Sequence, residues 1–317
     1  MAKKKTTRKK KKTAKKRSLK PFLWGIFFCS ILGITIVATG YVMFLAPGTR
    51  QANQAQEPIQ PQYKPITPSQ HEEYTEDVVT LEPIQHKHRI APKTAAPTPR
   101  IAILIDDMGN RHTIGQKLID LDMGLSFAFL PFTSHTQTLM NRAADHGCDI
   151  LLHLPMEATS AKWDPGPGTI TTDMSANAIT LQVLKNLLDV PKAIGVNNHM
   201  GSKFTSDKAS MQAALAPIKK RHLFFLDSMT SSTSVAFDTA RALDIKTGRR
   251  DIFLDNDQNG AKIKLQLEKL VQRARKNGSA IGIGHPYPAT LATLKKEQWW
   301  LKNQVEIVRI SELMTRQ

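Results

Sequence analysis

The stretch IAILIDDMGN, residues 101–110, joins an apolar strand to two adjacent acids. Its first five residues are apolar and mostly β-branched, which favours a strand buried in a sheet. Asp106 and Asp107 follow directly, and then come a Met and a Gly. Buried charges are costly unless they are paired, so two carboxylates at the end of a buried strand require a chemical partner nearby. The stretch predicts a core strand with a candidate site at its carboxyl end.

Similar apolar runs recur along the rest of the chain, and amphipathic segments separate them. Helical patterns begin near Ser134, Ser175 and Asn259 and end at His146-Gly147, Pro191 and Asn277-Gly278. Short apolar strands that alternate with helices indicate a parallel sheet covered by helices. About 220 residues of such units fit a closed or nearly closed β/α barrel. A doubly wound sheet is the alternative, but no glycine-rich phosphate loop follows the first strand. The further predicted strands are LSFAFL (125–130), DILLH (149–153), AIGVN (193–197), LFFLD (223–227), DIFLD (251–255), AIGIG (280–284) and VEIVRI (305–310).

The strong positive charge of the chain is concentrated in its first 20 residues. They contain twelve Lys or Arg and no acid, whereas the whole chain has a formal net charge of +17. A tail of this kind can bind nucleic acid or anionic lipid through phosphate groups. The segment that follows favours the lipid, so we expect residues 1–20 to be a basic cytoplasmic tail that does not bind nucleic acid.

Residues 21–46 form an apolar segment without a charged side chain. About 20 apolar residues span a bilayer, and this segment is longer. Basic residues are concentrated before it, which predicts a cytoplasmic N-terminus and an exported C-terminal part. A cleavable signal peptide is the alternative, but its apolar region is about 7–15 residues long. We therefore predict a transmembrane anchor.

Residues 47–98 are rich in Gln, Pro, Thr and Ala and show almost no apolar periodicity. This composition predicts a disordered, partly extended linker. The only two cysteines are Cys29, within the predicted anchor, and Cys148. They exclude a disulfide framework, so the domain predicted over residues 99–317 must be stabilised by its own core.

Ionisable or glycine-rich residues gather at nearly every predicted strand end. In a β/α barrel these carboxyl ends build the active site. His and carboxylate side chains with an open coordination position suit a catalytic zinc or a similar divalent ion, which polarises a carbonyl and activates water. A second carboxylate can then accept a proton and a further His can donate one. The strand ends are Asp106-Asp107, HLPME (153–157), NNHMGS (197–202), DSMTSS (227–232), LDND (254–257) and GHPYP (284–288).

The two adjacent acids suggest a division of labour. Neighbouring side chains on a strand point in opposite directions. One of Asp106 and Asp107 can therefore face a metal ion while the other faces the substrate water. The alternative is that one of the two caps the following helix.

The motifs IDDMG, HLPME, GVNNHMGS, FFLDS and GIGHPYPATL occur in this order between residues 99 and 315. In this order they resemble the divergent polysaccharide deacetylases, relatives of metal-dependent carbohydrate esterases that remove N-acetyl groups. The resemblance implies a distorted seven-stranded β/α barrel. It also implies that Asp106 is the base, that Asp107 binds the metal and that His285 is the acid.

The sequence departs from the better-known deacetylases at the other metal ligands. Those enzymes carry two His four residues apart, whereas this chain has His153 and Glu157 at that spacing, and His199 is a candidate for the second imidazole. The arginine-bearing motif of those enzymes is absent. The expected metal ligands are thus Asp107, His153, His199 and Glu157. Asp227 is expected either to bind the metal or to orient His285.

Together these features predict an inner-membrane protein with a periplasmic, zinc-dependent deacetylase domain that acts on an envelope or extracellular polysaccharide. Its expected partners are the polysaccharide, the membrane, anionic lipid at the basic tail and other cell-envelope proteins. The alternative is a catalytically degenerate module of the same fold that binds glycan or acts as a scaffold. A nucleic-acid binder is a third hypothesis and depends on the basic tail alone.

Overall fold

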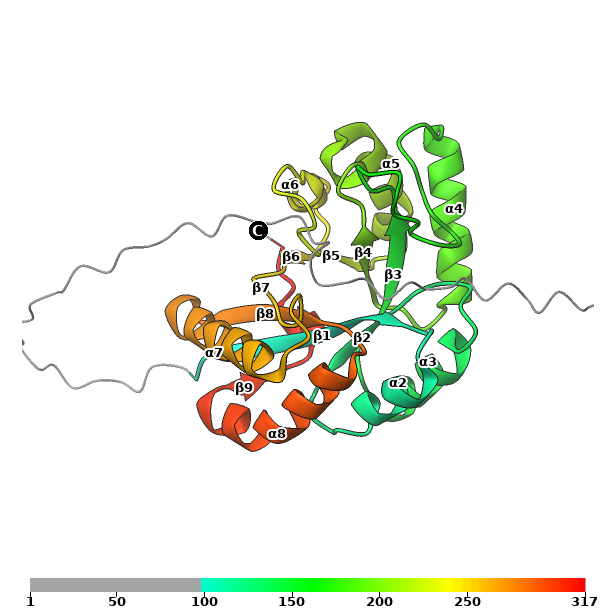
Figure 1. The fold of residues 1–317 in the computed structure, drawn as a ribbon. Coiled ribbons are helices and arrows are strands. Elements are labelled where there is room, and N and C mark those ends of the chain that lie inside the picture. The colour runs from blue at the N-terminus through cyan, green and yellow to red at the C-terminus, as the bar shows by residue number, and fades with distance from the viewer. Residues whose placement is uncertain (1–97, 317) are drawn as a thin grey trace, which may run out of the picture. The chain divides into compact units, whose positions relative to one another are not determined.

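The structure is a computed structural model that describes residues 98–316. The predicted tail, anchor and nearly all of the predicted linker lie outside the described residues, which Figure 1 draws in colour. Among residues 98–316, no helix is both long enough and apolar enough to span a membrane. The described residues thus belong to the predicted C-terminal domain.

A curled parallel sheet forms the centre of this domain (Figure 1). Its strands follow the order β6-β5-β4-β3-β2-β1-β8-β7, and β9 pairs with β1. All eight strands predicted from the sequence are present, and the predicted barrel-like class is confirmed. The strands are β1 (Arg100–Met108), β2 (Ser126–Phe129), β3 (Ile150–Met156), β4 (Gly195–Met200), β5 (Phe224–Asp227), β6 (Thr247–Arg249), β7 (Ile252–Phe253), β8 (Ser279–Gly284) and β9 (Glu306–Ile307).

The sheet contains nine strands rather than the seven that the family resemblance implies, in part because one position of the barrel wall is divided. Only Arg250 and Asp251 separate β6, which pairs with β5, from β7, which pairs with β8. The Arg250 amide donates to the Asp227 carbonyl, and the Asp251 amide donates to the Ile281 carbonyl. Successive residues thus bond to opposite neighbours, as in an interior strand. We conclude that β6 and β7 act as one interrupted strand. The other strand beyond the implied seven is β9.

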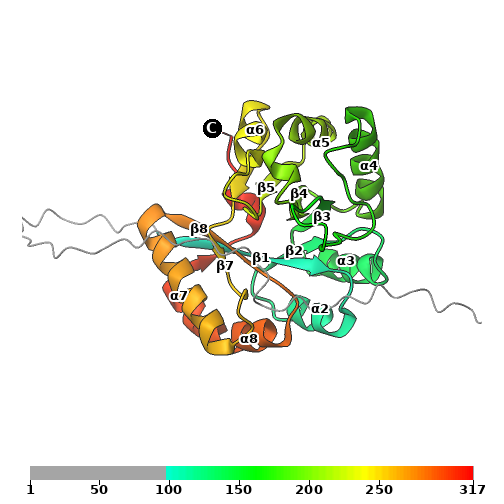
Figure 2. The same ribbon diagram turned by 45° about the horizontal axis from the view of Figure 1, so that its top comes forward.

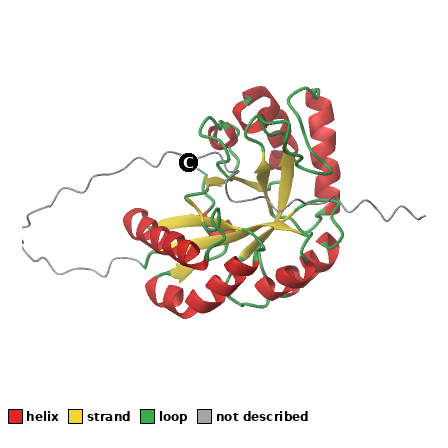
Figure 3. Cartoon of the chain, viewed as in Figure 1, coloured by secondary structure: helices red, strands yellow, loops and turns green. Residues whose placement is uncertain are grey.

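Helices cover the outer side of the sheet (Figures 2 and 3). The three predicted helical segments correspond to α3, α4 and α7. Ser175, Asp207 and Asn259 cap α4, α5 and α7 by accepting backbone amides with their side chains. The helices are α2 (His112–Ile119), α3 (Thr136–Asp145), α4 (Ala176–Asp189), α5 (Lys208–Lys220), α6 (Ala236–Ala242), α7 (Gly260–Asn277) and α8 (Pro288–Gln304), with short 3-10 turns η2 (Phe204–Ser206) and η3 (Ile310–Leu313).

Strand alternation divides the apolar core into two parts. Ile101, Ile103 and Ile105 of β1 belong to a large cluster that also contains helix residues. Ala102 and Leu104 point the other way, into a smaller cluster inside the barrel. The period of two along each strand therefore determines which side chains face the barrel interior.

Candidate functional site

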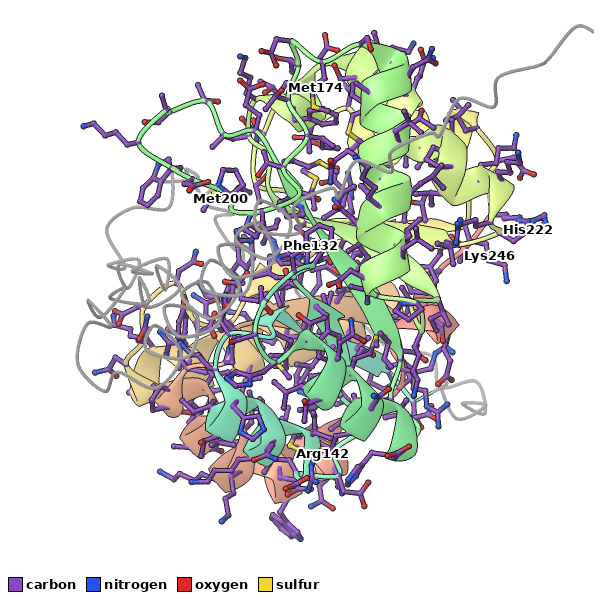
Figure 4. All side chains as sticks on the ribbon, turned by 90° about the vertical axis from the view of Figure 1, so that its right-hand side faces the viewer. Phe132, Arg142, Met174, Met200, His222 and Lys246 are labelled. Atoms are coloured by element: carbon purple, nitrogen blue, oxygen red, sulfur yellow. The ribbon has the colours of Figure 1, made fainter. Side chains whose placement is uncertain are left out.

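At the carboxyl ends of the strands, polar residues occupy the positions whose side chains face the barrel interior. Asp106 follows Ala102 and Leu104 on β1, and His153 follows Leu151 on β3. The β3–β4 register pairs His153 with Asn197 and Pro155 with His199, so these two β4 residues share the same face. His285 follows Ile281 and Ile283 of β8 in the same way. Figure 4 shows Met200, the last residue of β4, on the side opposite to His222 and Lys246, which precede β5 and β6. The inward-facing polar residues lie at the carboxyl end.

The end of β1 brings both of its acids to the same place. The backbone φ of Asp107 is 55°, in the left-handed region, and the β1–β2 register shifts between Ile105 and Met108. Strand alternation therefore ends at this point. The carboxylate oxygens of Asp106 and Asp107 lie 3.7 and 3.2 Å from Nε2 of His153. The expectation that alternation would separate the two acids is wrong, because the left-handed turn redirects Asp107.

A glycine makes this turn possible. Gly109 has a φ of 121°, and a Cβ added there would collide with the Thr133 side chain in the loop after β2. The His135 amide in the same loop donates to the Gly109 carbonyl. The loops after β1 and β2 therefore pack directly against each other beside the two acids.

Three potential metal ligands converge at this end of the barrel. His199 Nδ1 lies 3.0 Å from both Asp107 Oδ1 and His153 Nε2, and His153 Nε2 lies 3.2 Å from Asp107 Oδ1. All three residues are buried. Ligands about 2.0–2.1 Å from a tetrahedral zinc are separated by about 3.3 Å, so the observed triangle is close to the required size. The residues present therefore fit a divalent metal ion bound by one carboxylate and two imidazoles.

The two adjacent acids have opposite electrostatic environments. Burial raises the pKa of Asp106 above its ordinary value, and the attraction of His153 offsets this only in part. Burial also opposes ionisation of Asp107, but His199 and His153 outweigh it and hold its pKa well below the ordinary value. Asp107 is therefore suited to be an ionised ligand, whereas Asp106 retains more affinity for a proton. Such a separation is typical of acids with different roles.

A second His–carboxylate pair lies on β8. His285 Nδ1 lies 2.8 Å from Oδ1 of Asp255, whose Oδ2 accepts the His285 amide at 2.6 Å and the Thr290 hydroxyl at 2.6 Å. Burial alone lowers the pKa of His285, but the negative charge of Asp255, with smaller contributions from Asp107 and Asp106, outweighs it and raises the pKa to about 9. His285 thus stays protonated at neutral pH, as a general acid requires.

The structure places Asp227 away from this pair. Its carboxylate accepts the Met229 amide and the Ser234 hydroxyl, each at 2.8 Å, and the Phe237 amide at 3.3 Å. Leu226 faces the barrel interior, so strand alternation turns Asp227 outward toward α6. The expected pairing of Asp227 with His285 is wrong. Asp255 takes this position, and the strand-end motif LDND was the available signal.

Glu157 is not part of the ligand triangle. One carboxylate oxygen accepts both the amide and the hydroxyl of Thr172 at 2.8 Å, and the other lies 2.7 Å from Lys203 Nζ. Glu157 follows the last residue of β3, so the period of the strand no longer directs its side chain inward. Its contacts connect the loop after β3 with the loop after β4, and the cluster of possible metal ligands contains His199 instead.

Comparison with known proteins identifies similar chains. The model of a family described as divergent polysaccharide deacetylase matches residues 103–314. The uncharacterized protein YibQ of Escherichia coli strain K12 is 35% identical over 215 residues, which cover 68% of this chain and 67% of that protein. An uncharacterized protein of Haemophilus influenzae (strain ATCC 51907 / DSM 11121 / KW20 / Rd) is 35% identical over 216 residues, or 68% of this chain and 76% of that protein.

A solved structure agrees with the fold described above. The crystal structure of an uncharacterized protein from Agrobacterium tumefaciens C58 superposes with a TM-score of 0.66 at 29% sequence identity. The match covers 70% of this chain and 92% of that one. The similarity therefore extends over nearly the whole related domain.

Proposed function

The chain belongs to the divergent polysaccharide deacetylase family, and from this membership and the geometry of the site we propose that it is a metal-dependent hydrolase that removes N-acetyl groups from a cell-envelope polysaccharide. The observation that carries the proposal is the convergence of Asp107, His153 and His199, with Asp106 beside them. A ligand triangle and an adjacent acid of raised pKa are the elements that metal-assisted hydrolysis requires.

The proposed division of roles follows from the contacts. Asp107, His153 and His199 would hold a divalent ion, which we propose to be zinc because imidazole and carboxylate ligands suit it. Such an ion would supply a polarised amide carbonyl and a more acidic water. Asp106 accepts a proton from the water that attacks the acetyl carbon. His285, oriented by Asp255, donates a proton to the amide nitrogen as the carbon–nitrogen bond breaks. The products are acetate and a free amine on the sugar.

The surrounding residues suit the acid role of His285. Its ring centroid lies 6.0 Å from that of Phe253, in a stacked arrangement, and 5.5 Å from that of Tyr287. Tyr287 is buried, and Arg111 lies over its ring at 5.2 Å. These rings restrict the orientation of the imidazole and limit its contact with water, which strengthens its interaction with Asp255.

The cellular setting of this activity rests on the sequence. We propose that residues 21–46 anchor the chain in the inner membrane, with residues 1–20 in the cytoplasm near anionic lipid and the hydrolase domain in the periplasm. The substrate in this setting is a polysaccharide of the envelope.

Two measurements on the purified full-length chain test the proposal. The first is metal content after equilibration with Zn²⁺, for which we expect one bound ion per chain. The second is acetate release from peptidoglycan and from an N-acetylglucosamine oligomer, which we expect to disappear in Asp106→Asn. Asp227→Asn is a matched control, because it removes a buried acid outside the site.

Different outcomes distinguish the hypotheses. A folded chain that binds no divalent metal contradicts the proposal at its first step. A chain that binds metal and glycan but releases no acetate contradicts the proposed hydrolysis and supports the glycan-binding module.

A further inference from the structure

The side chain of Asn197 lies between the two halves of the proposed site. It is fully buried on β4. Its Nδ2 donates to both carboxylate oxygens of Asp106, at 2.9 and 3.1 Å, and lies 3.1 Å from Ser228 Oγ. Its Oδ1 lies 3.0 Å from His153 Nδ1. Asn197 thus contacts both the proposed base and a proposed metal ligand.

The orientation of this amide is determined by its neighbours. An ionised carboxylate only accepts hydrogen bonds, so the NH₂ group of Asn197 must face Asp106. One of its two hydrogens is directed to that carboxylate and the other to Ser228 Oγ. The carbonyl oxygen is then left to face His153. The reversed orientation would place two acceptors against each other at about 3 Å, which buried polar groups avoid.

This orientation specifies which nitrogen of His153 carries the hydrogen. Because Asn197 Oδ1 is an acceptor, His153 Nδ1 must be the donor. In the neutral imidazole the lone pair is then on Nε2. Nε2 is the atom that lies 3.2 Å from Asp107 Oδ1 and 3.0 Å from His199 Nδ1. The amide therefore directs the lone pair of His153 into the ligand triangle.

We propose that Asn197 is a positioning residue that acts on both halves of the site: its carbonyl orients His153 for metal binding, and its NH₂ group holds Asp106 beside the attacking water. The inference rests on the proposed function. Asn197 would thus have two separable effects, one on metal affinity through His153 and one on turnover through Asp106. A residue that merely filled the core would affect neither metal affinity nor turnover directly.

The neighbouring Asn198 provides a matched control. It is also buried on β4, but alternation directs it to the opposite face. Its Oδ1 accepts the Ser228 amide at 2.8 Å, and its Nδ2 donates to the Met200 carbonyl at 2.8 Å. Within residues 98–316, Asn198 contacts neither the ligand triangle nor Asp106. Asn198→Asp introduces the same charge as Asn197→Asp but loses the donor to the Met200 carbonyl, so we expect lower stability. In the folded variant, metal affinity and turnover should stay close to wild type.

Two variants of Asn197 separate its tasks in the metal-stripped full-length chain. Asn197→Leu has a similar volume but gives His153 no acceptor, so we expect Zn²⁺ affinity to fall about 10–100-fold. Asn197→Asp keeps an acceptor for His153 but removes the donor to Asp106 and places a like charge beside it. We therefore expect Asn197→Asp to retain Zn²⁺ affinity while turnover falls about 10–100-fold or more.

The measurements are Zn²⁺ titration calorimetry and acetate release from whichever of peptidoglycan or an N-acetylglucosamine oligomer the wild type hydrolyses. Wild-type Zn²⁺ affinity in a folded Asn197→Leu, or wild-type turnover in Asn197→Asp, overturns the inference. If Asn197→Leu does not fold, Asn197→Asp still decides, because loss of both metal and turnover would also overturn it. Failure of the wild type itself to bind Zn²⁺ contradicts the proposed function instead.

Discussion

The contact between His285 and Asp255 leads to a prediction about the free energy of unfolding, which can be tested without a substrate. In the folded chain the pKa of His285 is raised from 6.5 to about 9, which corresponds to about 3 kcal/mol of preferential stabilisation of its protonated form. Both side chains are buried, so solvent screens the interaction little. Asp255→Asn removes the largest of the charges that raise this pKa and retains one acceptor oxygen. The smaller attractions of Asp107 and Asp106 remain and still oppose the effect of burial, so the pKa of His285 should fall toward its ordinary value of 6.5.

The sign of the pH dependence follows from linkage. A pKa that is raised by folding adds stability that is fully present below 6.5 and is lost as the pH rises through about 9. The free energy of unfolding should therefore differ most between wild type and Asp255→Asn at about pH 6. We expect that difference to shrink by about 3 kcal/mol by pH 9 to 9.5.

Urea unfolding of the metal-free chain at a series of pH values measures this difference. Asp227→Asn is the control, because Asp227 accepts two backbone amides and a hydroxyl that do not titrate between pH 6 and 9. Its destabilisation should be independent of pH over this range. If the destabilisation caused by Asp255→Asn is also independent of pH between 6 and 9, the reasoning is refuted. A His285 pKa near 6.5 in the wild type would refute it as well.

Five other substitutions test the ligand triangle, His285, Glu157 and the turn at Gly109, with Gly166 as a control. Asp107→Ala should abolish Zn²⁺ binding. His285→Ala should leave metal content unchanged and remove most turnover. Loss of the metal from His285→Ala would show that His285 is itself a ligand. Glu157→Gln should retain stoichiometric Zn²⁺ in metal analysis, because Glu157 contacts two loops and lies outside the triangle. Gly109→Ala should lower the free energy of unfolding by roughly 2–4 kcal/mol, since a Cβ both strains its backbone and collides with the neighbouring loop. Gly166→Ala, at a φ of 87° with open space around it, should cost only about 1–2 kcal/mol by the same urea measurement.

Eight of the strands and three of the seven α-helices in the described residues could be predicted from the sequence because their signals are local. Apolar runs, caps and glycine stops carry enough information to place elements such as α7, whose stripe of Ile263, Leu267, Leu270 and Val271 is buried. The division of one wall position between β6 and β7 was not predictable. Thr247–Arg249 is short and carries little apolar character, and its strand geometry depends on hydrogen bonds to β5.

The candidate site was predictable in its composition but not in its pairing. The sequence placed Asp106, Asp107, His153, His199 and His285 at strand ends, and the structure brings the first four of them within 4 Å of one another in successive contacts. The sequence suggested Asp227 as a possible partner of His285, whereas the structure pairs His285 with Asp255. That choice depends on whether each acid falls on an inward or an outward position of its strand, which requires the phase of the alternation to be known.

The position of the second imidazole illustrates why register matters more than spacing in this chain. A ligand pair four residues apart on one segment can be read from sequence, and that spacing suggested Glu157. The β3–β4 ladder instead pairs Pro155 with His199, so His199 lies on the same face as His153 and one strand away. Adjacent parallel strands are about 4.8 Å apart, a separation that two imidazoles can bridge to reach a common point.

Asn197, two residues before His199, is brought beside His153 by the same register. A slip of one residue between β3 and β4 would turn both side chains away from the barrel interior. The proposed metal ligand and the residue that positions it are thus specified together by a single strand pairing.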